Sequence, residues 1–223
     1  MIEVNPQGEV WVFAEQEGGK LSDVPLELLG KGRSLAEKLS VPLAAVLAGK
    51  DVRPLADTLI AHGADKVYLV EDDRLEHYQA RSYSRVLCNL IEQYKPQIVM
   101  YGATPLGRDL APTVASAMKC GLTADCTDLQ IGDHVEPITK HLYKNLLFQI
   151  RPAFGGNIIA TIVNYDRWPQ MATVREGVMP MPAPDESRRG EIIECKADLD
   201  GLVLPLKILE THRRERKVNL KAA

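Results

Sequence analysis

The feature that most constrains the fold of this chain is a regular alternation, in its first half, of short apolar runs with stretches of helical periodicity. The apolar runs are bounded by turn residues, as strands are, and they lie at residues 10–14, 41–48, 66–70 and 97–101. Apolar residues recur at helical spacing between and after these runs, at residues 25–39, 55–60, 78–94 and 106–118. Apolar strands separated by helices are typical of a parallel sheet covered on both faces. The sequence therefore predicts an α/β fold built on a doubly wound, mostly parallel sheet.

The pattern changes after Gly121, which we expect to end the last of these helices. Strand-like runs separated by short turns follow, and they predict a β-rich extension of the sheet at residues 122–131, 135–142, 146–150 and 158–163. A proline- and charge-rich stretch at residues 180–190 is typical of a linker, and two apolar alternations follow it, at residues 191–199 and 203–209. We therefore assign residues 1–180 to the α/β domain and residues 181–223 to a linker and extension.

Composition argues against several classes of function. The formal net charge of −3 offers no basic footprint for nucleic acid. No apolar run approaches the roughly 20 residues that span a bilayer, and the first residues lack the pattern of a secretory signal, so we expect a cytoplasmic protein without a membrane span. The four cysteines form no C-x-x-C pair and the five histidines are scattered, so the sequence predicts no metal site.

One candidate binding element follows the apolar run at residues 97–101. Thr104 can cap a helix that starts at Pro105, Gly107 permits a close backbone approach, and Arg108 adds a fixed charge. Open parallel sheets bind ligands at this edge, and free amides at a helix start favour an anion. The same residues also fit a capped helix whose arginine pairs with a neighbouring acid, and both interpretations remain open. The stretch is not a G-x-G-x-x-G or Walker sequence.

A second candidate is Arg151, which ends the strand-like run at residues 145–150. Pro152 follows at once and cannot donate a ladder hydrogen bond, and Phe154 and Gly155 come two positions later. A fixed cation beside an aromatic ring and a bare backbone suits an electron-rich planar or anionic ligand. The alternative interpretation is a Gly-Gly hairpin whose arginine is merely solvated.

The sequence contains no set of residues that resembles a catalytic centre. Residues 169–175 form another strand-like run that ends in an arginine, which by itself is typical of a core strand with a surface arginine. No nucleophile–base pair and no G-x-S-x-G stretch occurs. We therefore expect a binding or scaffolding domain without catalytic residues of its own.

Four stretches together resemble the α subunit of electron-transfer flavoproteins. They lie, in the same order and at the same spacing as in that family, at residues 102–112, 121–127, 151–157 and 169–175. The resemblance covers nearly the whole chain. It implies a nucleotide α-hydrolase-like amino-terminal domain that forms a heterodimer with a β subunit. It also implies electron transport between flavin dehydrogenases and other redox partners.

The Arg-Pro-Ala-Phe-Gly-Gly stretch is more similar to the bifurcating, NADH-using branch of the family than to the mitochondrial type. In that branch the matching arginine reaches from the α subunit to the flavin ring bound in the β subunit, which implies that Arg151 contacts flavin in trans. Such a guanidinium would favour the reduced or anionic flavin and so tune its potential. The match also implies cofactor contacts for Phe154, Gly155, Thr104 and Arg108.

Family α subunits continue into a carboxy-terminal domain that binds FAD through glycine-rich stretches, and none of those stretches occurs in this sequence. The resemblance therefore implies the amino-terminal domain alone, either as a fragment, which we favour, or as a natural protein that has lost the second domain. We expect FAD to be bound by the β subunit and by the second domain, with NADH as a further candidate cofactor. The runner-up function is an independent nucleotide-binding module of the same fold, for which residues 15–20 are a weak glycine-rich loop because two acids oppose phosphate.

Overall fold

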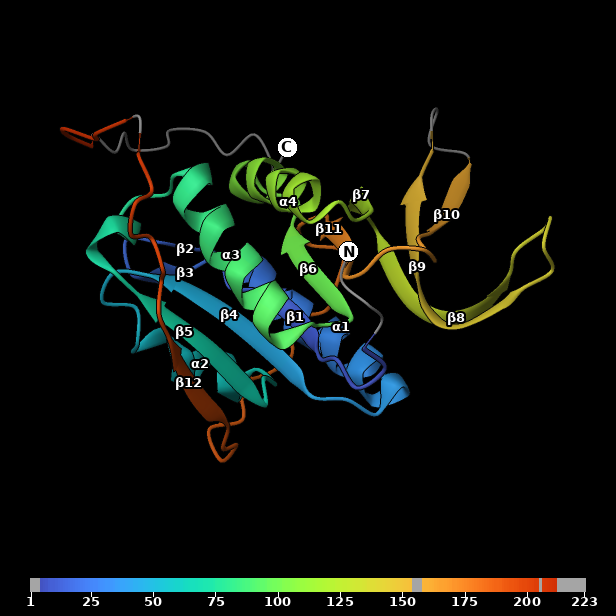
Figure 1. Cartoon of the computed structure of the whole chain (residues 1–223). Coiled ribbons are helices and arrows are strands. Elements are labelled where there is room, and N and C mark those ends of the chain that lie inside the picture. Colours follow the sequence, from blue (N-terminus) through green and yellow to red (C-terminus); the bar gives the residue numbers. More distant parts are fainter. Residues whose placement is uncertain (1–4, 154–157, 205, 212–223) are drawn as a thin grey trace.

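The computed structural model describes residues 5–153, 158–204 and 206–211, and its centre is a parallel sheet (Figure 1). The sheet has seven strands in the order β12-β5-β4-β1-β6-β11-β7, and all neighbouring strands run parallel. Their bounds are β1 Val10–Phe13, β4 Leu43–Gly49, β5 Lys66–Glu71, β6 Ile98–Gly102, β7 Leu122–Cys126, β11 Gln170–Val174 and β12 Glu191–Cys195. The predicted doubly wound, mostly parallel α/β fold is confirmed.

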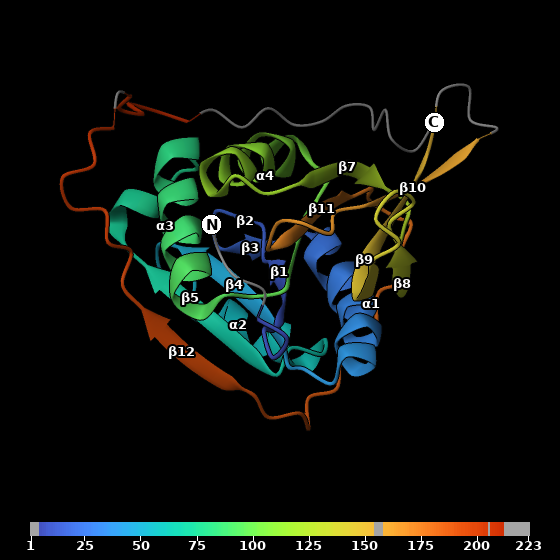
Figure 2. The ribbon, with the colours of Figure 1, turned by 45° about the vertical axis from the view of Figure 1, so that its right-hand side comes forward.

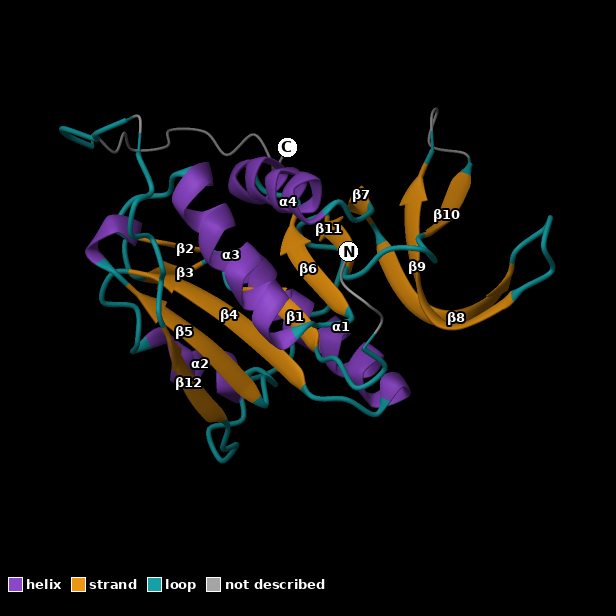
Figure 3. Ribbon diagram, in the orientation of Figure 1, coloured by secondary structure: helices purple, strands orange, loops and turns teal. Residues whose placement is uncertain are grey.

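Helices cover both faces of this sheet, as Figure 2 shows in the turned view and Figure 3 shows by colour. Helices α1 (Asp23–Leu39) and α2 (Leu55–Ala61) pack on one face, and helices α3 (Ala80–Tyr94) and α4 (Pro105–Met118) pack on the other. A short 3₁₀ turn, η1 (Asp73–Leu75), precedes α3. The central strands β1, β4 and β6 are almost wholly apolar because their successive residues enter the two cores alternately.

A second, antiparallel sheet projects from the β7 edge of the main sheet (Figure 1). We call it the arm, and it consists of β8 (Asp128–Val135), β9 (Leu142–Pro152) and β10 (Ile159–Val163), with β9 in the middle. A small hairpin, β2 (Gln16–Glu17) and β3 (Lys20–Leu21), follows β1. The predicted β-rich extension therefore divides between strands of the main sheet and this separate arm.

Several predicted boundaries after α4 are wrong. The helix predicted at residues 106–118 is confirmed and ends at Met118, but its carboxyl cap is Lys119, which adopts the left-handed conformation with φ 55°, rather than Gly121. The predicted strand at residues 122–131 is two strands, because a bend at Thr127 separates β7, in which Asp125 has φ 61°, from β8. The predicted strand at residues 135–142 is the turn between β8 and β9, where the Glu136 carboxylate accepts the backbone N–H of Ile138 at 3.1 Å.

The region after residue 180 is more closely tied to the main sheet than a linker would be. We assigned residues 181–223 to a linker and extension, but β12 within that region pairs with β5 and forms the edge of the sheet opposite β7. The chain before β12 is also held, because the Asp185 N–H donates to the Ala61 carbonyl at the end of α2 at 2.9 Å. The strand predicted at residues 203–209 does not form in the described part of that stretch.

Candidate functional site

Thr104 caps helix α4 at the carboxyl end of β6. Its hydroxyl oxygen accepts the Gly107 N–H at 2.9 Å and donates to a Glu15 carboxylate oxygen at 2.5 Å. Gly107 packs closely on the strand, because a Cβ there would lie 1.9 Å from the Gly102 carbonyl oxygen. The buried hydroxyl of Thr104 is thus engaged by protein groups, and the Glu15 carboxylate beside it disfavours an anion at this helix start.

Arg108 lies one helical turn further along α4 and is held from two directions. Its Nε donates to the Ala103 carbonyl at 2.8 Å, and its Nη2 approaches Asp125 Oδ1 at 3.1 Å. Of the two interpretations left open by the sequence, this arrangement is the capped helix whose arginine pairs with a neighbouring acid.

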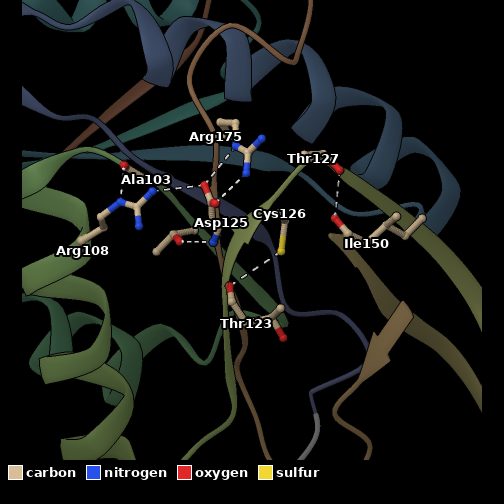
Figure 4. A network of polar contacts seen from close by, with 9 residues as sticks. Ala103, Arg108, Thr123, Asp125, Cys126, Thr127, Ile150 and Arg175 are labelled. Atoms are coloured by element: carbon tan, nitrogen blue, oxygen red, sulfur yellow. Dashed lines mark hydrogen bonds and ion pairs between the residues drawn. The ribbon is translucent and has the colours of Figure 1, made fainter. Parts of the chain in front are cut away.

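Asp125 is the centre of a charged cluster that joins three distant segments (Figure 4). Its carboxylate accepts from Arg108 on α4 and from Arg175, which follows β11, with Arg175 Nη2 only 2.7 Å from Oδ2 and Nε 3.3 Å from Oδ1. The Asp125 N–H donates to the Thr173 hydroxyl at 2.9 Å, which joins β7 to β11 where their register shifts. We call Arg108, Asp125 and Arg175 the junction cluster.

The cluster strongly favours the ionised form of Asp125. The hydrogen bonds from Arg175 hold the pKa of the Asp125 carboxyl below its ordinary value of 3.8, and the charges of Arg108 and Arg151 act in the same direction. The neighbouring Cys126 thiol is different, because burial raises its pKa to about 12. This thiol is therefore a packed apolar group, not a nucleophile.

Arg151 lies near the end of β9, where it pairs with Ala160 of β10. The residue before it, Ile150, is tied to the junction, since its carbonyl accepts the Thr127 N–H at 2.8 Å (Figure 4). Arg151 is half-buried, and within the described residues its side chain makes no hydrogen bond or ion pair. The other predicted residues of this stretch, Phe154 and Gly155, lie outside the described residues.

The structure brings Arg108 and Arg151 to the surroundings of Asp125. The Thr104 hydroxyl is directed to Glu15 instead. The sequence analysis missed Asp125 and did not assign Arg175 to the site. One signal was present for Asp125: it is one of two acids, with Asp128, in the strand-like run at residues 122–131. Its partnership with Arg175 could not be read from a separation of 50 residues.

The glycine-containing loop at residues 15–20 forms the β2–β3 hairpin. Gln16 reaches from it over the carboxyl end of β4, where its Nε2 donates to the Ala48 carbonyl at 3.2 Å. A Cβ on Gly49 would lie 2.6 Å from the same nitrogen, so the side chain is closely seated. Folds of this class bind nucleotides at these strand ends, and here the chain's own Gln16 covers one of them.

Two cavities, of about 660 and 630 Å³, lie among the described residues toward the opposite edge of the sheet from the arm. The first is lined by the end of α2 and residues 184–192, and the second by α3 and the end of β12. Within the described residues, no group of three His, Cys, Asp or Glu side chains is arranged to hold a metal ion. None of the described helices has the length and apolar character needed to cross a bilayer. Arg151 is therefore presented on a projecting sheet, not inside either cavity.

Comparison with known proteins shows a close relationship over nearly the whole chain. A family model described as the electron transfer flavoprotein domain matches residues 10–200. The electron transfer flavoprotein subunit alpha of Thermoanaerobacterium thermosaccharolyticum is 43% identical over 221 residues, which are 99% of this chain and 64% of the relative. The subunit of the same name from Megasphaera elsdenii is 47% identical over 201 residues, which are 90% of this chain and 57% of the relative.

A third relative has a more specific printed function. The lactate dehydrogenase (NAD(+),ferredoxin) subunit LctC of Acetobacterium woodii is 36% identical over 214 residues, which are 96% of this chain and 49% of the relative. The chain thus spans about half to two thirds of the length of the curated relatives it matches.

Proposed function

The chain belongs to the electron transfer flavoprotein family, and from that premise we propose that its arm delivers Arg151 to a flavin held by a partner β subunit. The observation that supports this proposal is the difference in pairing between Arg151 and the two neighbouring arginines. Arg108 and Arg175 are both bound to Asp125, whereas the guanidinium of Arg151 has no ion-pair or hydrogen-bond partner within the described residues. A fixed cation with unused donors on a projecting sheet is suited to a ligand brought by another chain.

The chemistry of the arginine fits the FAD that the family implies. A bound flavin supplies reversible electron transfer, and its ring has acceptor atoms and gains negative charge on reduction. The planar guanidinium donates in a fixed fork and stays charged at all physiological pH values, so Arg151 favours the reduced form. We also assign Phe154 and Gly155 to this contact as a prediction, and we assign Thr104 and Arg108 to its supporting structure.

We propose a β subunit as the partner in a heterodimer, and the arm as part of the contact surface. Ile158 and Ile159 are 63% and 72% exposed, close in sequence to Arg151's pairing partner Ala160. Apolar side chains beside an unpaired cation form a surface that a second chain would cover. The flavin would then lie at the boundary between the two subunits.

We further propose a cytoplasmic electron carrier that serves a flavin dehydrogenase and takes part in NADH-linked electron bifurcation. The match to LctC, whose printed name joins NAD(+) and ferredoxin, supports this branch of the family. Catalysis of the dehydrogenation itself would belong to the partner enzyme.

The test is to purify the 223-residue chain alone and after co-expression with a family β subunit, and to record size and visible spectrum. We expect a heterodimer with flavin absorption. In that heterodimer, Arg151→Gln should lower the flavin midpoint potential, because a positive charge that favours the reduced ring is lost. A heterodimer whose flavin titrates identically with and without Arg151 would refute the role of this residue.

A further inference from the structure

Three arginines and one carboxylate meet where the arm leaves the main sheet. Arg108 comes from α4, Arg175 follows β11, and Arg151 lies next to the end of β9, while Asp125 lies in β7 at a shift of its register with β11. A single carboxylate cannot pair fully with three guanidiniums at once. Which arginine is left without a partner then depends on competition for Asp125.

The contacts show how that competition is resolved. Oδ1 of Asp125 receives Arg108 Nη2 at 3.1 Å and Arg175 Nε at 3.3 Å, and Oδ2 receives Arg175 Nη2 at 2.7 Å. The forked contact with Arg175 is the geometry that guanidinium and carboxylate groups prefer. Three donors therefore use most of the roughly four acceptor sites of this carboxylate before Arg151 is considered.

Arg151 lies near Asp125 through the neighbouring backbone of β7 and β9. The backbone before it is joined to the residue after Cys126 by the bond from Thr127 N–H to the Ile150 carbonyl, and β7 and β9 contact each other. The charge of Arg151 also acts on Asp125, where it helps to lower the pKa of the carboxyl. If Asp125 lost Arg108 and Arg175, its carboxylate would therefore attract the guanidinium of Arg151.

We propose that Arg108 and Arg175 are positioning residues for Arg151: by occupying the Asp125 carboxylate, they keep the guanidinium of Arg151 free to bind an electron-rich ligand. The role of that ligand as a flavin rests on the proposed function, but the competition for Asp125 is a property of this chain alone. This competition explains why the junction cluster lies beside Arg151 although Arg151 forms no ion pair with Asp125.

The first test measures the availability of Arg151 in the isolated chain with phenylglyoxal, which attacks unpaired guanidiniums, and reads each modified peptide by mass. In the unchanged protein we expect rapid modification at Arg151. The variant Arg108→Gln/Arg175→Gln frees Asp125, so modification of Arg151 should slow by about fivefold or more, a factor typical of one charge-assisted contact. Adding Asp125→Asn to that variant removes the competitor and should restore the original rate.

The third substitution is suited to this purpose because asparagine tolerates the left-handed backbone that residue 125 adopts at φ 61°. The chain also offers a matched control at the other edge of the sheet, where Arg33 and Arg188 share Asp65 Oδ1 at 2.6 and 3.1 Å. Arg33→Gln/Arg188→Gln should leave the rate at Arg151 unchanged. An unchanged rate in Arg108→Gln/Arg175→Gln, or no recovery on adding Asp125→Asn, would overturn the proposal.

The second test uses the heterodimer with its flavin. Arg108→Gln/Arg175→Gln should shift the flavin potential in the same negative direction as Arg151→Gln, and Asp125→Asn should reverse the shift. A tenfold change in preference for the reduced flavin corresponds to about 30 mV for a two-electron couple. Merely structural damage would accumulate with the third substitution instead of being reversed, and that outcome also overturns the proposal.

The two tests separate the two ideas. If Arg151→Gln leaves the potential unchanged, the proposed flavin contact fails, yet the phenylglyoxal rates still decide whether Arg108 and Arg175 control the availability of Arg151. If those rates fail to follow the predicted order while Arg151→Gln shifts the potential, the flavin contact stands and the competition is refuted.

Discussion

The main sheet and the arm both contain apolar strand residues, but they bury these residues to different extents. In β4 every residue is buried, whereas in β10 every residue is exposed or half-buried. The difference follows from coverage, because helices lie on both faces of the parallel sheet and the arm's strands have no such double cover in the described structure (Figure 3). The main sheet supplies stability, and the arm supplies accessible groups.

The arm is nevertheless fixed at its base, and the contacts there come from different elements. The Leu147 N–H donates to the buried Gln170 side chain of β11 at 2.8 Å. Lys31 of α1 forms an ion pair with Asp128 at 2.6 Å. Together with the junction cluster, these contacts let an exposed sheet hold Arg151 in a defined place. The comparison teaches that stability and presentation are divided between two sheets joined at one edge.

The largest expected difference between the two sheets comes from making the same substitution, isoleucine to alanine, in each of them. Ile98 in β6 is fully buried and Ile159 in β10 is 72% exposed. Ile98→Ala should lower the free energy of unfolding by about 2–5 kcal/mol, because a cavity forms in the core, and Ile159→Ala should change it by less than about 0.5 kcal/mol. Urea denaturation followed by circular dichroism measures both. Equal losses of unfolding free energy would mean that Ile159 in the arm contributes as much to stability as Ile98 in the main sheet.

Two glycines extend the comparison to the backbone. A Cβ at Gly107 would lie 1.9 Å from a carbonyl oxygen of β6, whereas a Cβ at Gly132 in the arm would lie 2.7 Å from the ring of Phe148. A ring can move and a strand carbonyl cannot, so Gly107→Ala should cost about 3 kcal/mol and Gly132→Ala about 1 kcal/mol. Thermal unfolding of the two variants tests the order, and a larger loss for Gly132→Ala would contradict it.

The junction between the two sheets should respond to pH through Asp125. Its folded-state pKa lies below the ordinary 3.8, so its contribution to stability is present above pH 3.8 and is lost as the pH falls through the folded value. Asp125→Asn should therefore cost about 1 kcal/mol at pH 7 and progressively less in more acidic solution. Unfolding free energies at a series of pH values provide the measurement. A constant difference at all pH values would show that the charge is not what stabilises the junction.

The smallest effect concerns the ion pair at the base of the arm. Burial raises the pKa of Asp128, but hydrogen bonds from Lys31 and Gln130 outweigh it and hold the pKa below its ordinary value. Lys31→Met should cost about 0.5 kcal/mol, as partly exposed pairs do, with the loss shrinking in high salt. Hydrogen exchange should quicken in β8 and remain unchanged in β4. Quickened exchange in both sheets would mean that the arm and the main sheet open together.

Most of the first half of the fold could be predicted from the sequence, because local periodicity reports it directly. Each of the four strands predicted at residues 10–14, 41–48, 66–70 and 97–101 overlaps an observed strand closely. The second half was harder, since an apolar run of five residues says nothing about its partner. Thus β11 lies between β6 and β7, and β12 lies at the far edge beside β5.

The candidate site divides in the same way. Arg151, Thr104 and Arg108 were recognisable from motifs, and the capped helix at Thr104 was one of two interpretations that the local sequence supported. Asp125 was missed because its importance depends on Arg108 and Arg175, which come from segments on either side of it in the chain. Asp125 becomes the centre of a cluster only when folding brings Arg108 and Arg175 to it.

Sequence alone determined the fold class and the family, because both can be recognised from residues that are close together in the chain. These local signals are the apolar periodicity, the helix caps and the short motifs that occur in a fixed order. Tertiary structure decided which strands pair, where the arm leaves the sheet, and which arginine remains unpaired beside Asp125. The physical reason is that pairing and charge competition are long-range. Their free energies depend on distances between residues far apart in the chain, and those distances exist only once the chain has folded.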